Sequence, residues 1–445
     1  MIGGIKLKLL KITVGNFKNI AKTTIQLSKI TALVSTNNYG KTNLLEAIQF
    51  GFDFIAASSK GRNNMMHWSK GIPLAPSLAG EEFVFSIEFD APELGEYRFV
   101  RYGFAFSWFN DQETGARITD EVIEMRANES VRYTSYLKRD KGLYKGGKAK
   151  TNFRKVNLVK DALAIDALSL IDDIDIADVI VAIKTLSYRM CNTLELDNSF
   201  KPNPIEFDFG SNSSVVFDDD DIPRAISVLK RDNPDQYKVF LDTIYDLFPE
   251  FLNVALQAYT INGETVKAKA IMVSAGEEEV DKPDIPYRIR DEIYKLIIES
   301  RHLNQPISME YMSTGTKRIF WLIANAVFAG CYKTSFLGVD EVETSIHPKM
   351  IQSLLEALSE ILGESTMLIT SHSPYLVQYL KPGSIYVGVP NEDGVAKFRK
   401  IQQSKIKQLI SVTRDLETSV GEYLFELMSG DDDSAEILSA YLEDS

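Results

Sequence analysis

The chain carries, near its start, the octapeptide Ser35-Thr36-Asn37-Asn38-Tyr39-Gly40-Lys41-Thr42, whose order of residue types suits phosphate binding. A small-residue loop of this kind can turn backbone N–H groups toward phosphate oxygens, and the helix after it adds the positive end of its dipole. Lys41 would reach the terminal phosphates, and the Thr42 hydroxyl would complete the shell of a magnesium ion. Ser35 stands where the pattern has glycine, which matters only if this position needs a positive φ. The octapeptide predicts a triphosphate site.

A second candidate anion site is the stretch Met-Ser-Thr-Gly-Thr-Lys-Arg at residues 312–318, which opens an apolar helix expected over residues 319–329. Ser313 is the expected N-cap of this helix, because a serine hydroxyl can accept a hydrogen bond from the first turn. On its own the stretch is merely a helix start. Beside a phosphate loop, a helix N-terminus that bears a hydroxyl becomes another place for an anion.

Two acids and a histidine follow short apolar runs later in the chain. Asp340 and Glu341 come directly after residues 335–339, so a strand there would place both carboxylates at the sheet edge where α/β proteins bind ligands. Asp340 would hold magnesium through water and Glu341 would deprotonate the attacking water; a salt-bridged pair is the alternative. His372 follows residues 367–371 and could donate to a γ-phosphate oxygen, although a lone histidine at a strand end is otherwise most often structural.

The elements that must position these groups can be read from the hydrophobic pattern. Residues 30–34 form an apolar run typical of a buried strand, and the helix after Thr42 is expected to continue to about residue 55. From 83 to 137 the period changes to two, which predicts strands at 83–89, 97–109 and 118–125, with a hairpin loop at 110–115. The aromatic residues in these strands are expected to form a core and not a base-stacking platform.

The middle of the chain, from about 157 to 250, has a helical period. Pro249 is expected to end a helix whose apolar face includes Phe240 and Ile244. The four adjacent acids at 218–221 suggest a solvated loop or an N-cap before Pro223 more than a metal site, because neighbouring residues do not converge on one ion. Asn262-Gly263 predicts a hairpin between strands at 254–260 and 266–273.

Residues 138–155 form a strongly basic segment in an acidic protein. Eight positive side chains accompany one acid, Asp140, and glycines separate them. Such a segment could contact a nucleic-acid phosphate backbone, or it could be a solvated loop at a hairpin tip; the sequence leaves both open. The basic residues are Lys138, Arg139, Lys141, Lys145, Lys148, Lys150, Arg154 and Lys155.

The composition limits the class of protein. The chain has 445 residues, 44% hydrophobic and 25% charged, with a net charge of −13, which fits an ordinary globular protein and argues against a general nucleic-acid coat. Cys191 and Cys331 are the only cysteines and lack metal-ligand spacing, so we expect buried thiols in a reducing compartment. The sequence contains neither a signal-peptide core nor an apolar run long enough for a bilayer, so we expect a cytoplasmic protein without membrane contact.

The order of the four chemical stretches resembles the ABC-type ATPase heads of the RecF, SMC and OLD group, which include AAA15/AAA21-like ATP-binding proteins. The resemblance covers residues 5–55 and 285–390 and includes Ile-Thr-Val-Gly-Asn-Phe-Lys at 12–18. It implies an α/β P-loop NTPase of the ABC-head type, with a mixed sheet, an antiparallel β subdomain and an inserted helical region. The implied segments are two head lobes at 1–82 and 285–390, a β subdomain at 83–156, a helical insertion with a hairpin at 157–284, and a helical tail at 391–445.

The same resemblance assigns roles to individual residues. In such proteins two heads sandwich two ATP molecules, so Lys41 and Thr42 of one copy would meet Ser313 and Gly315 of another across the nucleotide. Asp340 would be the Walker B acid that holds Mg²⁺. Glu341 would be the catalytic base and His372 the switch histidine. The implied assembly is a homodimer or a larger homo-oligomer that hydrolyses ATP.

The chain also resembles stand-alone ATPase subunits of bacterial antiphage systems of the Septu (PtuA) and PARIS (AriA) kind. After Tyr375 we find no arrangement of acids typical of the TOPRIM nuclease domain that follows the head in OLD nucleases. The resemblance therefore implies an antiviral-defence ATPase with a separate nuclease or toxin as partner, and DNA as a further contact. One alternative is a DNA-repair ATPase of the RecF or SMC type. Another is that the chain cuts nucleic acid itself through its acidic clusters.

Overall fold

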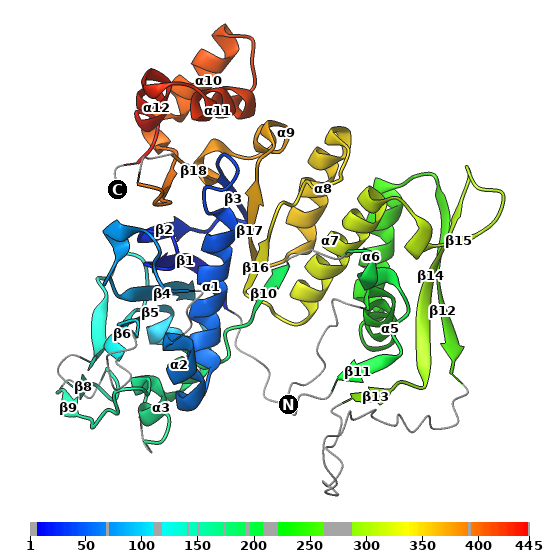
Figure 1. Cartoon of the computed structure of the whole chain (residues 1–445). Coiled ribbons are helices and arrows are strands. Elements are labelled where there is room, and N and C mark those ends of the chain that lie inside the picture. Colours follow the sequence, from blue (N-terminus) through cyan, green and yellow to red (C-terminus); the bar gives the residue numbers. More distant parts are fainter. Residues whose placement is uncertain are drawn as a thin grey trace, which may run out of the picture. The chain divides into compact units, whose positions relative to one another are not determined.

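The computed structural model describes residues 7–67, 71–109, 118–139, 142–148, 152–171, 174–191, 196–207, 221–261, 287–389 and 393–443 (Figure 1). The chain divides into two compact units, and each is described by itself below. The first combines Met1–Asn192 with Ala329–Ser445, and the second comprises Thr193–Phe328. The helical insertion expected at 157–284 thus differs from the second unit at both ends.

An antiparallel sheet of eight strands forms one part of the first unit, in the order β2-β1-β4-β5-β6-β7-β8-β9. Strands predicted at 83–89, 97–109 and 118–125 are confirmed as β4, β5 and β6, whereas the hairpin loop at 110–115 lies outside the described residues. The strands are β1 (Lys8–Gly15), β2 (Thr23–Gln26), β4 (Phe83–Asp90), β5 (Phe99–Phe106), β6 (Ile118–Arg126), β7 (Thr134–Lys138), β8 (Leu143–Tyr144) and β9 (Arg154–Lys155).

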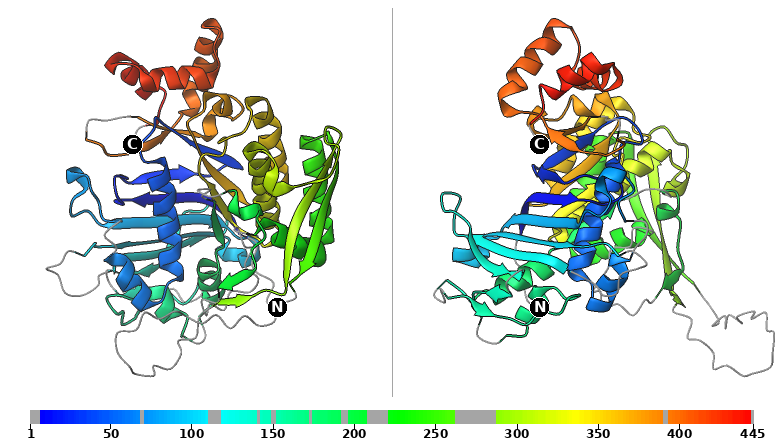
Figure 2. Two further views of the ribbon diagram at one scale, coloured as in Figure 1. Left: turned by 45° about the vertical axis from the view of Figure 1, so that its right-hand side comes forward. Right: turned by 60° about the vertical axis from the view of Figure 1, so that its left-hand side comes forward.

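Helix α1 (Lys41–Ala56) lies against this sheet (Figures 1 and 2). The Phe54 ring stacks on Phe104 and Phe106 with centroid separations of 4.8 and 5.0 Å. Gly51 permits the close approach, because a Cβ there would lie 2.1 Å from the Phe85 ring. These aromatic strand residues are buried, so the expectation that they form a core is confirmed.

A second sheet of six strands contains the elements that carry the chemistry, in the order β10-β16-β17-β3-β18-β19. All neighbouring pairs are parallel except β18 with β19. Every residue of β3, β16, β17 and β18 is buried, which explains why apolar residues predominate in these strands. The strands are β3 (Ile30–Val34), β10 (Tyr188–Cys191), β16 (Phe336–Val339), β17 (Thr366–Ser371), β18 (Ile385–Gly388) and β19 (Phe398–Lys400).

Helices complete the first unit, and three of them follow β19 at the end of the chain. Of these three, α11 packs against α9 (Figure 1). The contact is tight, since a Cβ on Gly421 would lie 2.1 Å from the carbonyl oxygen of Pro374. The helices are α2 (Ser59–Met66), α3 (Ala164–Leu168), α4 (Ala177–Lys184), α8 (Pro348–Ile361), α9 (Pro374–Val377), α10 (Ile406–Asp415), α11 (Val420–Ser429) and α12 (Asp432–Ser439).

The second unit contains helices and strands together. Its three-stranded sheet is β12 (Phe251–Thr260), β14 (Glu292–Ser300) and β15 (Ile307–Ser308), and a smaller ladder joins β11 (Ile205–Phe207) to β13 (Tyr287–Ile289). The helices are α5 (Ile222–Asp232), α6 (Pro234–Leu247) and the start of α7 (Thr314–Cys331).

The predicted helix boundaries in this unit are confirmed where they can be seen. Asp221 is the N-cap of α5: its carboxylate accepts a hydrogen bond from the Arg224 backbone N–H at 3.1 Å. The buried face of α6 includes Phe240 and Ile244, and the helix ends two residues before Pro249. The other three acids of the run, at 218–220, and the Asn262-Gly263 turn lie outside the described residues.

Candidate functional site

A hollow of about 660 Å³ lies in the first unit, and several of the residues that the sequence singles out line it. Its lining comes from three separate segments that the parallel order of β3, β16 and β17 brings to one sheet edge. The predicted convergence of Lys41, Glu341 and His372 on one site therefore agrees with the fold. The lining residues are Asn37, Asn38, Tyr39, Gly40, Lys41, Thr42, Asn43, Glu341 and His372.

The loop between β3 and α1 bends at two residues with left-handed backbone. Asn38 has a φ of 60° and Gly40 a φ of 117°. Gly40 has no room for a side chain either, because a Cβ would lie 2.9 Å from that of Ala396. Ser35 is buried and has no positive φ, so the serine fits a position where the pattern has glycine.

Lys41 points back into its own loop. Its Nζ donates to the carbonyl oxygens of Ser35 and Thr36, each at 3.1 Å. Burial lowers the pKa of this amine, and the carboxylates of Glu341 and Asp340 oppose that shift. An amine held inside a ring of loop carbonyls beside two acids can exchange those carbonyls for phosphate oxygens.

Asp340 is held by hydroxyl groups from two other segments. The Thr42 hydroxyl donates to Oδ2 at 2.8 Å, and the Thr370 hydroxyl donates to Oδ1 at 2.5 Å. Thr370 also accepts the Glu341 backbone N–H at 2.8 Å. A threonine hydroxyl beside a carboxylate is an oxygen donor pair of the kind that holds Mg²⁺ when phosphates and waters supply the other ligands. Thr42 and Asp340 therefore fit the predicted metal position.

Glu341 and His372 face each other at the mouth of the hollow. Glu341 has a φ of 45°, an unusual backbone for a residue other than glycine and one that recurs at functional sites. Its Oε1 lies 3.7 Å from His372 Nδ1, and the two side chains are 47% and 42% exposed. Both groups can thus reach a ligand in the hollow, as the predicted base and phosphate-sensing histidine require.

Two residues that were not predicted, Thr370 and Glu343, contribute to the site, and Tyr39 of the predicted octapeptide has an anchoring role that sequence reasoning missed. Thr370 orients Asp340, and Glu343 accepts hydrogen bonds from Ser371 and His372. Tyr39 fixes the loop: its hydroxyl donates to the Val389 carbonyl at 2.5 Å. A signal was present for two of them, because Glu343 follows the predicted acids and Thr370 precedes the histidine.

Ser313 and Gly315 lie in the second unit, at the start of α7. The Thr316 backbone N–H donates to the Ser313 hydroxyl at 3.2 Å, so Ser313 is the helix N-cap as predicted. Just behind it, the buried Lys317 amine pairs with Asp197. Ser313 itself is exposed, which leaves its hydroxyl accessible at the helix terminus.

The basic segment has partly different roles from those expected. The ammonium groups of Lys138 and Lys145 lie over the Phe153 ring, 5.4 and 4.6 Å from its centroid. In the strand ladder, Lys138 pairs with Leu143, which pairs with Lys155, so the two lysines share one sheet face. Of the remaining predicted residues, Lys148 and Arg154 are exposed, and Lys141 and Lys150 lie outside the described residues.

Arg139 does not belong to the exposed basic surface. Its side chain is buried and donates to the carbonyl oxygens of Val159 and Ala162, each at 2.8 Å. The guanidinium also forms an ion pair of 3.2 Å with the fully buried Glu121. Arg139 therefore stabilises the fold of the β subdomain. The prediction that it contacts a nucleic-acid phosphate is wrong, because its side chain is buried.

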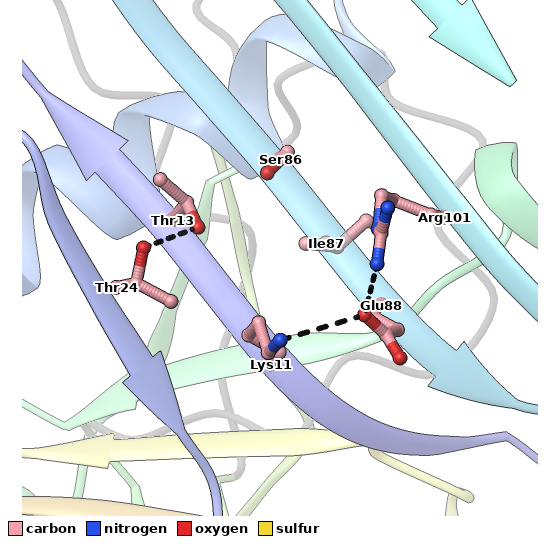
Figure 3. A pocket seen from close by; sticks show the side chains of 7 residues that line it. All are labelled: Lys11, Thr13, Thr24, Ser86, Ile87, Glu88 and Arg101. Atoms are coloured by element: carbon pink, nitrogen blue, oxygen red, sulfur yellow. Dashed lines mark hydrogen bonds and ion pairs between the residues drawn. The ribbon is translucent and has the colours of Figure 1, made fainter. Parts of the chain in front are cut away.

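A smaller hollow of about 210 Å³ lies on the outer face of the eight-stranded sheet (Figure 3). Glu88 is its central group and has Arg101 at 3.2 Å and Lys11 at 3.8 Å. Burial opposes ionisation of Glu88, but the Tyr133 hydroxyl and these cations outweigh it and lower the pKa of the carboxyl group. The charged groups of this hollow thus pair with one another.

Membrane spans and clusters of metal ligands are both absent from the described residues. None of the helices seen there has the length and apolar character needed to cross a membrane. Within the same ranges, no group of three or more His, Cys, Asp and Glu side chains is arranged to hold a metal ion. The hypothesis that the chain itself cuts nucleic acid stays a prediction.

Comparison with protein families gave one match over most of the chain. The family model described as "AAA domain, putative AbiEii toxin, Type IV TA system" matches residues 30–378. No curated protein gave a significant match.

Among solved structures, an Smc head bound to the C-winged helix domain of ScpA is similar with a TM-score of 0.51 at 14% identity, covering 90% of this chain and 99% of that one. An Smc head with an extended coiled coil, bound to the C-terminal domain of ScpA from Pyrococcus furiosus, gives 0.49 at 13% identity, with 92% and 100% covered. An SMC head domain from Thermotoga maritima gives 0.41 at 11%, with 89% and 99% covered. The first of these likenesses agrees with an ABC-type head fold.

Proposed function

Since the chain belongs to the AAA domain family whose model spans residues 30–378, we propose that it binds ATP with Mg²⁺ and hydrolyses it to ADP and phosphate. The observation that carries the proposal is the hydrogen bond between Thr42 and Asp340 beside a hollow lined by Lys41, Glu341 and His372. These five groups come from three segments, and each has a type that phosphoryl transfer needs.

The residues divide the chemistry among themselves. The N–H groups at the start of α1 bind the phosphates, and Lys41 exchanges the carbonyls of Ser35 and Thr36 for phosphate oxygens. Mg²⁺, when bound, neutralises charge that develops on the phosphate oxygens. Glu341 orients and deprotonates the attacking water, and His372 donates to the γ-phosphate.

A second copy of the chain completes the site in this proposal. Ser313 is exposed at the N-terminus of α7, where a hydroxyl and backbone N–H groups can meet an anion. Binding of the γ-phosphate between Lys41 of one copy and Ser313 of another would join two heads, and hydrolysis would release them. The ABC-head fold supports this arrangement.

The test is to measure nucleotide binding and phosphate release by the purified chain. We expect uptake of ATP with magnesium at millimolar nucleotide, release of phosphate, and a change from monomer to dimer in sedimentation when hydrolysis is blocked. A chain that takes up no nucleotide under these conditions would overturn the proposal. If the chain binds ATP but releases no phosphate, the proposal would be restricted to a protein that switches conformation on nucleotide binding.

We further propose that this ATPase serves in a bacterial defence complex, where it restrains or carries a nuclease or toxin partner. The family description names a toxin and a toxin–antitoxin system, which supports a role in a toxic system. Affinity purification from cells, with and without a block of hydrolysis, tests this idea. A nuclease or toxin that co-purifies would support it, and purification of the chain alone in both states would count against it.

A second candidate function is that of an ATPase in DNA repair. The likeness to an Smc head and the lysines on β7 and β9 support it. Neighbouring genes separate the two candidates. A small nuclease or TOPRIM reading frame beside this gene favours defence. Binding of DNA by the chain without any such neighbour favours repair.

A further inference from the structure

We propose that Glu343 is a positioning residue of the nucleotide site, which holds the His372 imidazole by its Nδ1 edge so that the opposite edge faces the phosphates. This inference rests on the proposed ATPase function. It gives a task to a buried acid that the reaction itself does not use. It also leaves Glu341 to the attacking water.

The first observation is that Glu343 ties two strand ends together. Its carboxylate oxygen Oε1 accepts the Ser371 hydroxyl at 2.8 Å and the His372 backbone N–H at 2.9 Å. Ser371 is the last residue of β17, whereas Glu343 belongs to the loop after β16. One oxygen thus fixes the backbone that presents His372.

The second observation is that the His372 ring has two acids within similar reach. Nδ1 lies 3.6 Å from Glu343 Oε1 and 3.7 Å from Glu341 Oε1. Both separations exceed a hydrogen bond, and catalytic contacts of this length often tighten when substrate binds. One Nδ1 proton cannot serve both carboxylates, so the two acids compete for it.

Burial decides that competition in favour of Glu343. Its side chain is 7% exposed and already held by two donors, whereas the side chain of Glu341 is 47% exposed. A fixed acceptor loses little further rotamer entropy on pairing, and an ion pair shielded from water is screened less than an exposed one.

The chemical consequence follows from the geometry of imidazole. A ring whose Nδ1 edge is held by a carboxylate presents the opposite edge, with Nε2, to a phosphate oxygen. Without Glu343 the ring would turn to Glu341. The base and the phosphate donor would then neutralise each other.

The first test reads the ring itself and needs no activity. The chain has four histidines, so ¹⁵N-histidine NMR can assign the ring nitrogens of His372 by comparison with the H372N variant. We expect the Nδ1 and Nε2 resonances of His372 to differ between the wild type and E343Q, because Gln keeps the size of the side chain but removes the charge that faces Nδ1. Identical His372 spectra in the two proteins would overturn the proposal, whether or not the chain hydrolyses ATP.

The second test is a double-mutant cycle in ATP turnover. We expect E343Q to lower kcat by about 10- to 100-fold with a KM changed by less than about threefold, and E343Q/H372N to be no slower than H372N. Losses that multiply in the double variant would show that Glu343 acts independently of His372. E360Q, which changes an exposed acid on α8, is the matched control.

A variant that keeps Glu343 guards against misfolding. S371A removes one of the two donors that fix Glu343 Oε1, and we expect the same change in the His372 spectrum as in E343Q, at smaller amplitude. If E343Q does not fold, the His372 spectrum of S371A tests the proposal in its place. A His372 spectrum in S371A that equals that of the wild type would then contradict the proposal.

Discussion

The hydroxyl of Thr42 donates a hydrogen bond of 2.8 Å to Oδ2 of Asp340, across 298 residues of chain. The contact joins the first turn of α1 to the carboxyl end of β16. It places the two expected magnesium ligands side by side in a protein whose phosphate loop and acids are far apart in sequence. The predictions below probe the groups around this contact.

Replacement of Lys41 by alanine should abolish tight binding of ATP. The Lys41 amine is the charged group of the loop, and it donates to the loop carbonyls that phosphate oxygens would replace. A hydrogen bond to a charged group contributes about 1.5–3 kcal/mol. We therefore expect affinity to fall by roughly 10- to 100-fold in calorimetric titration with ATP and magnesium. K60A, at an exposed position on α2, should bind like the wild type. Equal affinities of K41A and K60A would remove Lys41 from the site.

Replacement of Glu341 by glutamine should separate binding from hydrolysis. Glutamine keeps the size of the side chain but cannot take a proton from water, so turnover should fall by at least about 100-fold. ATP should still bind, and the variant should accumulate as a dimer in sedimentation with ATP. E360Q serves as the control. Normal phosphate release by E341Q would exclude Glu341 as the base.

A mixing experiment tests whether two copies share one nucleotide. S313N keeps a residue that caps helices well but enlarges it, so α7 should stay folded while the contact with a second copy is blocked. K41A and S313N should each be inactive alone. Mixed in equal amounts, they should recover activity, because a mixed dimer contains one site with both residues intact. Inactivity of the mixture, with both variants folded, would contradict the shared site.

Neutralising the basic surface should weaken DNA binding in a salt-dependent way. The variant would carry glutamine at Lys138, Lys145, Lys148 and Lys155. We expect the slope of log affinity against log salt to fall by about 0.9 for each DNA phosphate that the variant no longer neutralises. A control variant carries glutamine at four exposed lysines elsewhere, Lys60, Lys238, Lys381 and Lys407. An unchanged affinity and slope in the first variant would show that this surface is a solvated loop.

The thiol of Cys331 should react slowly until high pH. Burial raises the pKa of this thiol to about 11 from a reference of 9.0. At pH 8 the folded chain should therefore hold roughly 100-fold less thiolate at this position than an exposed cysteine, and react correspondingly more slowly with a chromogenic disulfide. The stability that this protonated thiol contributes is full below pH 9 and is lost as pH rises through 11. In a C191S background, reaction at the rate of glutathione would contradict the shift.

The placement of the central side chains could be predicted because it is encoded locally. Lys41, Asp340 and His372 each follow a short apolar strand, and parallel strands present their carboxyl ends at one sheet edge. Periodicity was equally sufficient for β4 and β6, where buried and partly exposed residues alternate over much of each strand. In β5 every residue but one is buried, and its aromatic residues gave the signal.

The groups that support the site could not be predicted, because their partners are remote in sequence. Tyr39 is anchored 350 residues away at Val389, and no local pattern shows that contact. The composition of residues 138–155 predicted a wrong role for Arg139 for the same reason. Arg139 is one of eight cations there, but its partner Glu121 belongs to β6, and only the fold reveals that the pair is buried.

The strand order of the six-stranded sheet has a consequence for how the protein is made. A ribosome produces β3 early, but β3 pairs with β17 and β18, whose residues begin at Thr366 and Ile385. At roughly 5–20 residues per second the nascent strand Ile30–Val34 waits tens of seconds with both edges unpaired. An apolar strand in that condition invites aggregation, so a cell that produces this protein must shield its N-terminal segment until almost the whole chain has emerged.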